Sequence, residues 1–349
     1  MKDFADVRVA VVGDLMLDVY TFGTVERVSP EAPIPILKQR STRSELGGAG
    51  NVARNVVALG AECHVLGVIG DDDVGGALRA RLNETVGKHS GLALVPDLTT
   101  TIKHRFVAGD THQLLRVDSE ALRIGLGNSR ALAYLDDVKP DVVVISDYDK
   151  GTIHPQLSAE IIDRKAWKVV VDSKSRDWHQ FNGAALMTPN LQELIDHSGV
   201  VTSPLDDYIR TSASHMIAGP LKIGSVAVTL GENGIWLQVD SGVAVPIAGH
   251  KVAVADITGA GDTVSAAMAV ALGSGMDLIA AAEVANALAA RVVTRPMAAV
   301  PTPDDIEHAR MTLWHLTQSQ KTSPRKKPAG SQSRKSQASS AGKTKPSAS

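Results

Sequence analysis

The chain has 349 residues, of which 44% are hydrophobic, enough for one large core of about 300 residues or for two smaller ones. The net charge is -2, but residues 317–349 hold eight Lys and Arg and no acid, so the body is acidic, which argues against a specific nucleic-acid partner. The single cysteine, Cys63, excludes a framework of disulfide bonds within the chain. The sequence has no signal-peptide pattern and no apolar run long enough to span a membrane, so we expect a cytoplasmic protein without a membrane partner.

The body of the chain alternates between two kinds of pattern. Short β-branched runs predict buried strands at residues 7–12, 63–69, 142–146, 169–172 and 225–230. Amphipathic or alanine-rich stretches predict helices at residues 49–59, 73–84, 154–164, 261–272 and 278–293. This alternation predicts an α/β three-layer sandwich with a mostly parallel central sheet, whose ligands bind beyond the carboxyl ends of the strands.

Two extended segments interrupt that rhythm. Residues 20–40 contain Thr, Val, Ile and three prolines without a helical period, and residues 99–117 alternate polar and apolar side chains. Proline-edged strands suit a small exposed sheet rather than the central one. We expect these segments to form a small β lid over the sheet; the alternative is a pair of separate surface hairpins.

The last segment, from Thr317, consists of Ser, Lys, Pro, Ala, Gln and Gly without an aromatic residue. Such a segment cannot bury enough apolar surface to offset its ordering entropy. The sequence therefore predicts one folded domain over residues 1–316 and a disordered basic tail over 317–349.

The most informative segment is DITGAGD at residues 256–262, directly before a helical run. Glycine permits positive φ and close backbone approach, so the amides of residues 259–262 would form an anion site at a helix N-terminus. Asp262 would face the same anion, where a carboxylate accepts a hydroxyl proton in phosphoryl transfer, and the helix would keep it ionised. The alternative is a tight turn with an ordinary first-turn acid. The catalytic candidates are Asp262, Gly259, Ala260 and Gly261.

This segment resembles the signature of the ribokinase-type carbohydrate kinases. Three further segments match that family in the same order: GGAGN at 47–51, NLQE at 190–193 and TLGENG at 229–234. The resemblance covers residues 7 to about 302 and implies a ribokinase-like sandwich that binds ATP and Mg²⁺ and phosphorylates a sugar hydroxyl. Lids of this type often pair between subunits in the family, which favours a homodimer formed through the lid.

Other segments narrow the resemblance to the kinase domain of heptose 7-phosphate kinases, notably GDLMLDVYTFG, ERVSPEAPIPIL and SDYDKG. They imply D-glycero-D-manno-heptose 7-phosphate as the substrate, phosphorylated at C1. Val19 stands where that group has Arg, and Asp149 where it has Gly; both bear on the substrate rather than on the reaction. The nucleotidyltransferase domain often fused to such kinases is not expected here.

The sugar side of the site is assigned from position. Asp14 and Asp18 follow the first strand and can accept bonds from sugar hydroxyls, or simply cap a loop. Gly47 and Gly48 can let the backbone approach a substrate closely; the alternative is a plain turn at the start of a helix. Asn51, one helical turn after Gly48, can bond a sugar hydroxyl or the end of the helix. In the second lid segment, the candidates for a substrate phosphate are Lys103, Arg105 and Arg116, which otherwise make a charged sheet edge.

The nucleotide side is assigned partly from chemistry and partly from the resemblance. Lys174 follows a strand and suits a nucleotide phosphate. Asn190 and Glu193 share a helix face and suit a hydrated Mg²⁺, with Glu193 as the metal residue, or form a capping box, or both. The resemblance implies that Thr229, Gly231 and Gly234 line the nucleotide and that Asn286 lies near the adenine. Open alternatives are another sugar or nucleoside kinase, or a nucleotide-binding protein that no longer catalyses.

Overall fold

The computed structural model describes residues 2–120, 124–199, 204–240 and 242–322, with side chains followed to residue 313. Within these residues, nine strands form one sheet in the order β13-β12-β11-β10-β9-β8-β1-β4-β5. Neighbouring strands are parallel from β5 to β11, and β12 and β13 are added antiparallel at one edge. The predicted α/β sandwich with a mostly parallel sheet is confirmed. The strands of this sheet are β1 (Arg8–Gly13), β4 (Glu62–Gly70), β5 (Ser90–Val95), β8 (Val142–Asp147), β9 (Lys168–Ser173), β10 (Leu186–Met187), β11 (Val226–Thr229), β12 (Gly234–Gln238) and β13 (Ala244–Ala248).

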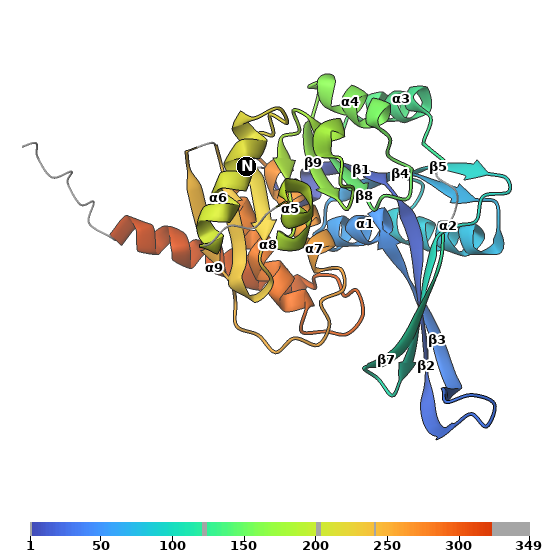
Figure 1. Ribbon diagram of the computed structural model, residues 1–349. Helices are drawn as coiled ribbons and strands as arrows, with labels where there is room; N and C mark the ends of the chain where they lie inside the picture. The colour runs from blue at the N-terminus through green and yellow to red at the C-terminus, as the bar shows by residue number, and fades with distance from the viewer. Residues whose placement is uncertain (1, 121–123, 200–203, 241, 323–349) are drawn as a thin grey trace, which may run out of the picture.

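Helices cover both faces of this sheet (Figure 1). In β1, Val9 and Val11 face one apolar core and Ala10 and Val12 face the other, so the strand is buried on both sides. Strands of this kind read as continuous apolar runs, which is why the sequence revealed them. One core packs α1 (Ala49–Ala58), α2 (Asp73–Val86), α7 (Ala260–Gly273) and α8 (Leu278–Val292), and the other packs α3 (Asn128–Val138), α4 (Pro155–Asp163), α5 (Leu191–Ser198) and α6 (Leu205–Ala218).

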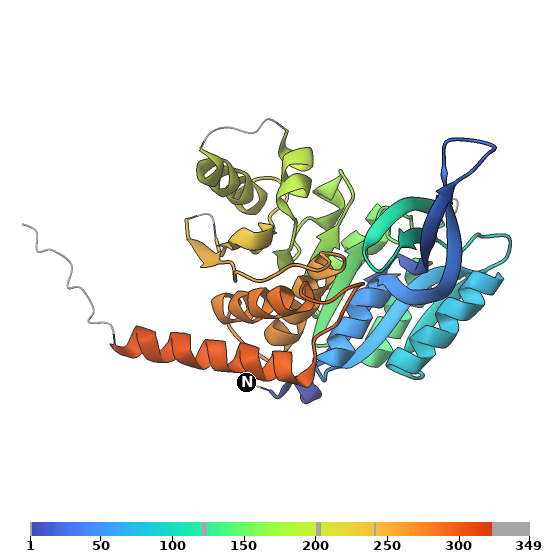
Figure 2. The same ribbon diagram turned by 90° about the horizontal axis from the view of Figure 1, so that it is seen from below.

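The helix α9 (Pro303–Thr322) packs against α8 and lies beside the N-terminal residues (Figure 2). It continues past Thr317, so the predicted start of the tail comes too early, and residues 323–349 lie outside the described part of the chain. No helix among the described residues is long and apolar enough to cross a bilayer.

A second sheet projects from the body (Figure 1). Its strands, in the part of the chain that is described, run in the order β3-β2-β6-β7, and we call them the lid sheet. Because β2 pairs with β6, the two extended segments form one sheet rather than two separate hairpins. The four strands are β2 (Leu15–Val28), β3 (Pro35–Gly48), β6 (Ile102–Ala108) and β7 (His112–Ser119).

Candidate active site

The predicted glycine turn lies at the start of α7. Gly259 is the N-cap residue with φ +81°, a left-handed conformation that favours glycine, and a Cβ there would lie 2.6 Å from the Asn51 side chain. The amides of Gly261 and Asp262 donate to no acceptor within the described residues, whereas the Ala260 amide donates to the Ile257 carbonyl at 3.2 Å. The start of the helix therefore presents two free N–H donors to an anion, as predicted. The N–H of Ala260 is not one of them, because it is already bonded to Ile257.

The Asp262 carboxylate is buried and held by residues from two other segments. The Asn51 amide in α1 donates to one of its oxygens at 2.7 Å, and the Tyr148 hydroxyl, in the loop after β8, donates to the other at 2.8 Å. The sequence offered a sugar hydroxyl or the helix end as the partner of Asn51. In the structure its amide group bonds Asp262, and its oxygen accepts a bond from Arg54 at 3.3 Å; a contact with the sugar stays a prediction.

The ionisation of Asp262 differs from the expectation. Burial, and then the nearby Asp172 carboxylate, raise the pKa of Asp262 to about 7, although hydrogen bonds from Asn51 and Tyr148 and the charge of Lys174 favour the ionised form. The prediction that the helix N-terminus keeps this acid fully ionised is wrong, because burial outweighs it. Near neutral pH the group is divided between the acid and the carboxylate, which suits a residue that accepts a proton and releases it again.

Lys174 links two acids beside this centre. Its ammonium group lies 2.6 Å from a Glu193 oxygen and 3.3 Å from an Asp172 oxygen. Burial alone would lower the pKa of Lys174, but the two carboxylates outweigh it and raise the pKa, so the group stays charged. Lys174 is thus a charged group whose positive charge favours the ionised form of Asp262.

Asn190 and Glu193 form the capping box that the sequence left open. The Asn190 side chain accepts from the Glu193 amide at 2.9 Å, and the Glu193 carboxylate accepts from the Asn190 amide at 2.8 Å. The second Glu193 oxygen contacts Lys174, so both oxygens have partners in this arrangement. Burial raises the pKa of Glu193, against the opposing effect of Lys174.

Asp14 holds a loop. Its buried carboxylate accepts three backbone N–H groups, from Tyr148 at 2.8 Å, Lys150 at 3.0 Å and Thr152 at 2.9 Å. The structure therefore shows the loop-capping role for Asp14, and its direct contact with a sugar stays a prediction. Asp14 therefore affects the site indirectly, because it fixes the backbone of Tyr148, whose hydroxyl bonds Asp262.

The two glycines before α1 make room for the protein's own groups. A Cβ on Gly47 would lie 2.4 Å from an Asp18 carboxylate oxygen, and Gly48 has φ +57°. Asp18 in turn accepts a hydrogen bond of 2.5 Å from Arg105 of the lid sheet. Arg105 is thus held by Asp18 where the lid sheet joins the body.

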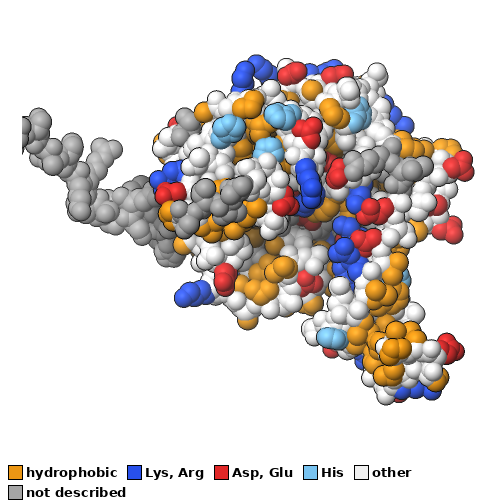
Figure 3. Space-filling model, in the orientation of Figure 1, with side chains coloured by type: hydrophobic (Ala, Val, Ile, Leu, Met, Phe, Trp, Pro, Cys, Tyr) orange, Lys and Arg blue, Asp and Glu red, His pale blue; other side chains and the backbone are white. Residues whose placement is uncertain are grey.

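Lys103, next to Arg105 on the same strand, is different. Its ammonium lies 5.2 Å from the centre of the Tyr148 ring and forms no ion pair within the described residues. Burial lowers the pKa of Lys103. Figure 3 shows Lys and Arg side chains gathered where the lid sheet meets the hollowed face of the body. Lys103 is therefore a half-buried cation with capacity for an anion, whereas Arg116 pairs with Asp118 on its own strand at 2.9 Å.

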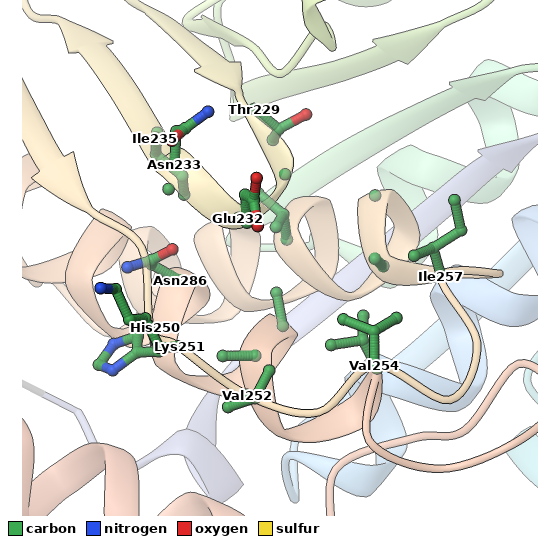
Figure 4. A pocket seen from close by; sticks show the side chains of 18 of the residues that line it. Thr229, Glu232, Asn233, Ile235, His250, Lys251, Val252, Val254, Ile257 and Asn286 are labelled. Carbon is green, nitrogen blue, oxygen red and sulfur yellow. The ribbon is translucent and has the colours of Figure 1, made fainter.

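A cleft of about 850 Å³ opens beside the start of α7. Figure 4 shows the side chains of Val252, Val254 and Ile257 along one side, with Asn286 on another. The Asn286 amide donates to the Ala248 carbonyl at 2.8 Å. The cleft brings together the predicted nucleotide residues and the catalytic turn: Asn190, Thr229, Gly231, Gly234, Asn286, Ala260 and Gly261 all line it.

Sequence reasoning missed several residues of this site. Tyr148 lies within SDYDKG, a segment that narrowed the resemblance but to which no site role was assigned, and the cleft wall at residues 250–254 was not expected. Asp149 is one departure from the heptose kinase pattern, and it has φ +57°. This left-handed conformation favours glycine, which explains why a glycine is expected at this position. The other, Val19, is a buried residue of β2.

The arrangement has a simple chemical meaning. Asp14, Tyr148, Lys174, Asn190 and Thr229 lie at or just after the carboxyl ends of five neighbouring strands, where ligands bind in such sheets. The cleft is lined by Ala260 and Gly261 at the start of α7, the helix that also carries the buried acid Asp262, whose pKa is raised to about 7. Asp262, Lys174 and Glu193 do not themselves line the cleft. Such a site suits the transfer of an anionic group to a hydroxyl.

Comparisons with known proteins agree with this geometry. The pattern of the pfkB family of carbohydrate kinases matches residues 7–305. The chain is 38% identical to the "Bifunctional protein HldE" of Caulobacter vibrioides and 40% identical to that of Rhodospirillum rubrum, over 84% and 87% of its length. It spans only 61% and 62% of those relatives.

Solved structures show the same fold. Phosphofructokinase-2 of Escherichia coli superposes with a TM-score of 0.74 at 21% identity, over 88% of this chain and 99% of that one. Ribokinase of Arabidopsis thaliana, complexed with ribose and ATP, gives 0.72 at 19% identity, over 87% and 98%. Because the family pattern covers most of the chain, the protein belongs to the pfkB family of carbohydrate kinases.

Proposed function

We propose that this sugar kinase uses ATP to phosphorylate a hydroxyl of a sugar phosphate, with D-glycero-D-manno-heptose 7-phosphate as the substrate and C1 as the acceptor carbon. One observation carries the reaction: Gly261, which lines the cleft, has a free amide next to the free amide and the carboxyl group of Asp262. The heptose assignment is supported by the segments that resemble heptose 7-phosphate kinases and by the similarity to the two HldE proteins.

In this proposal the residues have distinct roles. The Asp262 carboxylate accepts the proton of the acceptor hydroxyl as the oxygen attacks the terminal phosphorus of ATP. The amides at the start of α7 and the Lys174 ammonium stabilise the negative charge on the transferred group. Thr229, Gly231, Gly234 and Asn286 line the space for the nucleotide.

Mg²⁺ would supply charge neutralisation between the nucleotide phosphates. Both Glu193 oxygens already accept bonds from the Asn190 amide and from Lys174. Mg²⁺ usually keeps several waters in protein sites. We therefore place Glu193 as a residue that holds the hydrated ion through water, and Asn190 beside it.

Lys103 supports the assignment of a phosphorylated sugar as the substrate. This half-buried ammonium has no carboxylate partner among the described residues, whereas Arg105 beside it is paired with Asp18. A cation in that state is stabilised by an incoming dianion. Lys103, with Arg105 next to it, is the proposed contact for the sugar phosphate.

Replacing this lysine tests the phosphate contact. Lys103→Met is expected to raise KM for the phosphorylated sugar about tenfold to a hundredfold, since one charge-assisted bond contributes about 1.5–3 kcal/mol. KM for ATP should stay unchanged. Lys38→Met, which removes an exposed lysine of the same lid sheet, is the matched control. An unchanged KM for the sugar phosphate in the Lys103 variant would remove this contact from the proposal.

The substrate itself is tested by a screen of sugars, sugar phosphates and nucleosides with ATP and Mg²⁺, reading ADP release and the position of the new phosphate by ³¹P and ¹³C NMR. We expect turnover with a heptose 7-phosphate and a product phosphorylated at C1. A preference for an unphosphorylated sugar or a nucleoside would reassign the substrate, and no turnover with any acceptor would favour a non-catalytic nucleotide-binding protein.

The lid sheet supports a homodimer as part of the proposal. Exposed apolar side chains lie on two of its strands, β2 and β7, and on the loop between β2 and β3: Val25, Val28, Ile34, Leu115 and Val117. Apolar surface of this kind is a common feature of protein interfaces. Sedimentation velocity of the purified protein should show a dimer.

A cytoplasmic location is also part of the proposal, because it fits both the ATP requirement and the single free cysteine.

A further inference from the structure

Tyr148 occupies an unusual position between the sugar side and the nucleotide side of the site. Its hydroxyl donates to Asp262 at 2.8 Å. The ammonium groups of Lys103 and Lys174 lie 5.2 Å and 5.5 Å from the centre of its ring, distances at which cation–π attraction operates. Lys103 comes from the lid sheet and Lys174 from the end of β9, so this one ring contacts both sides of the site.

The loop that carries Tyr148 is held firmly. The Asp14 carboxylate accepts from the amides of Tyr148, Lys150 and Thr152, and the Asp147 carboxylate accepts from the Asp149 amide at 3.0 Å. Asp149 takes up the left-handed turn that directs the chain onward. Two buried carboxylates thus fix the backbone on either side of a single tyrosine.

The position of the hydroxyl explains what such a fixed tyrosine can do. A hydroxyl that donates to a carboxylate stabilises the ionised form and fixes the plane of the group. The pKa of Tyr148 is raised far above its ordinary value, by burial first and then by Asp262 and Asp172, so the hydroxyl remains a donor. It therefore opposes the effect of burial on Asp262 without ionising itself.

We propose that Tyr148 is a positioning residue that acts through Asp262, holding the carboxylate in one orientation and favouring its ionised form for proton acceptance. This role rests on the proposed kinase reaction. The other groups that face Asp262 come from different elements: Asp172 disfavours its ionised form, while Asn51 and Lys174 favour it. Without the tyrosine hydroxyl, fewer groups oppose the repulsion between the carboxylates of Asp172 and Asp262, so the pKa of Asp262 should rise.

The test is the pH dependence of Tyr148→Phe. Loss of one hydrogen bond to a carboxylate raises its pKa by about one unit. The acid limb of kcat/KM should therefore move up by about one pH unit, with about a fivefold loss at pH 7 and little loss at pH 9. Because both proteins use the same substrates, ionisation of the substrates does not affect the difference.

Two comparisons make the result specific. Tyr134→Phe removes a tyrosine hydroxyl that contacts His64 and serves as the matched control; its pH profile should equal that of the wild type. Replacing Tyr148 with 3-fluorotyrosine keeps the shape and makes the hydroxyl a stronger donor, so the acid limb should move to lower pH. This second change also covers the case in which the phenylalanine variant fails to fold.

A readout without turnover separates this role from the reaction. ¹³C-carboxyl NMR titration should show a higher pKa for Asp262 in Tyr148→Phe than in the wild type. An equal pKa and an unshifted acid limb would overturn the positioning role even if the kinase reaction is confirmed. If instead the wild type phosphorylates no acceptor, the reaction fails while the NMR shift still tests the contact.

Discussion

Asp262→Asn should lower kcat by about 10²-fold to 10⁴-fold, the range lost when a general base is removed. The replacement keeps the size of a side chain that is buried between Asn51 and Tyr148 but cannot accept the hydroxyl proton. ATP affinity, measured by calorimetry, should be retained because the cleft wall is unchanged. Turnover near that of the wild type would reject Asp262 as the base.

The same substitution has a predictable effect on stability. The pKa of Asp262 is raised from 3.8 to about 7 in the folded protein, so the fold favours its protonated form. The stability contributed by this group is complete below about pH 4 and is lost as the pH rises through about 7. The asparagine variant escapes that loss, and its melting temperature relative to the wild type should rise between pH 5 and pH 8.

A matched control is available in the next helix. Asp277 caps α8 by accepting from the Ala280 amide at 2.9 Å, and asparagine caps a helix about as well as aspartate. Asp277→Asn should therefore leave both turnover and the pH dependence of stability unchanged. A large loss of activity in this control would mean that any change to a helix-start acid disturbs the enzyme.

Asp14→Ala should destabilise the fold by about 2–4 kcal/mol, because three partly buried N–H groups lose their acceptor at once. Asp14→Asn keeps one acceptor oxygen and should lose less. Urea unfolding measures both variants. The alanine variant should also lose activity, since the loop that it frees carries Tyr148. Stability equal to that of the wild type would contradict the loop-holding role.

The sequence predicted the central sheet well because its signals are local. Strands buried on both faces appear as β-branched runs, and the glycine turn lies within seven consecutive residues. Helix α6 and strands β5, β10, β12 and β13 were not predicted, since short strands and mixed helices carry weak periodicity.

The connections within the site were beyond local reasoning. Asn51 and Asp262 meet although 211 positions separate them, and Tyr148 reaches Asp262 across 114. Such contacts depend on the order of strands in the sheet, which a single sequence does not show. For this reason the partners that Asp14 and Asn51 have inside the protein were not predicted, although both residues suited a sugar in isolation.

The lid sheet is joined to the catalytic centre without connecting loops. Strand β3 ends at Gly48 and α1 begins at Ala49, two residues before Asn51, whose side chain bonds Asp262. Strand β2 likewise starts one residue after Asp14. The long hairpin of β2 and β3 is therefore continuous at both of its ends with the segments that hold Asp14 and Asn51. If Asp262 is the proton acceptor that we propose, a displacement of the lid sheet by a second subunit or a bound sugar is expected to act on it through Asn51.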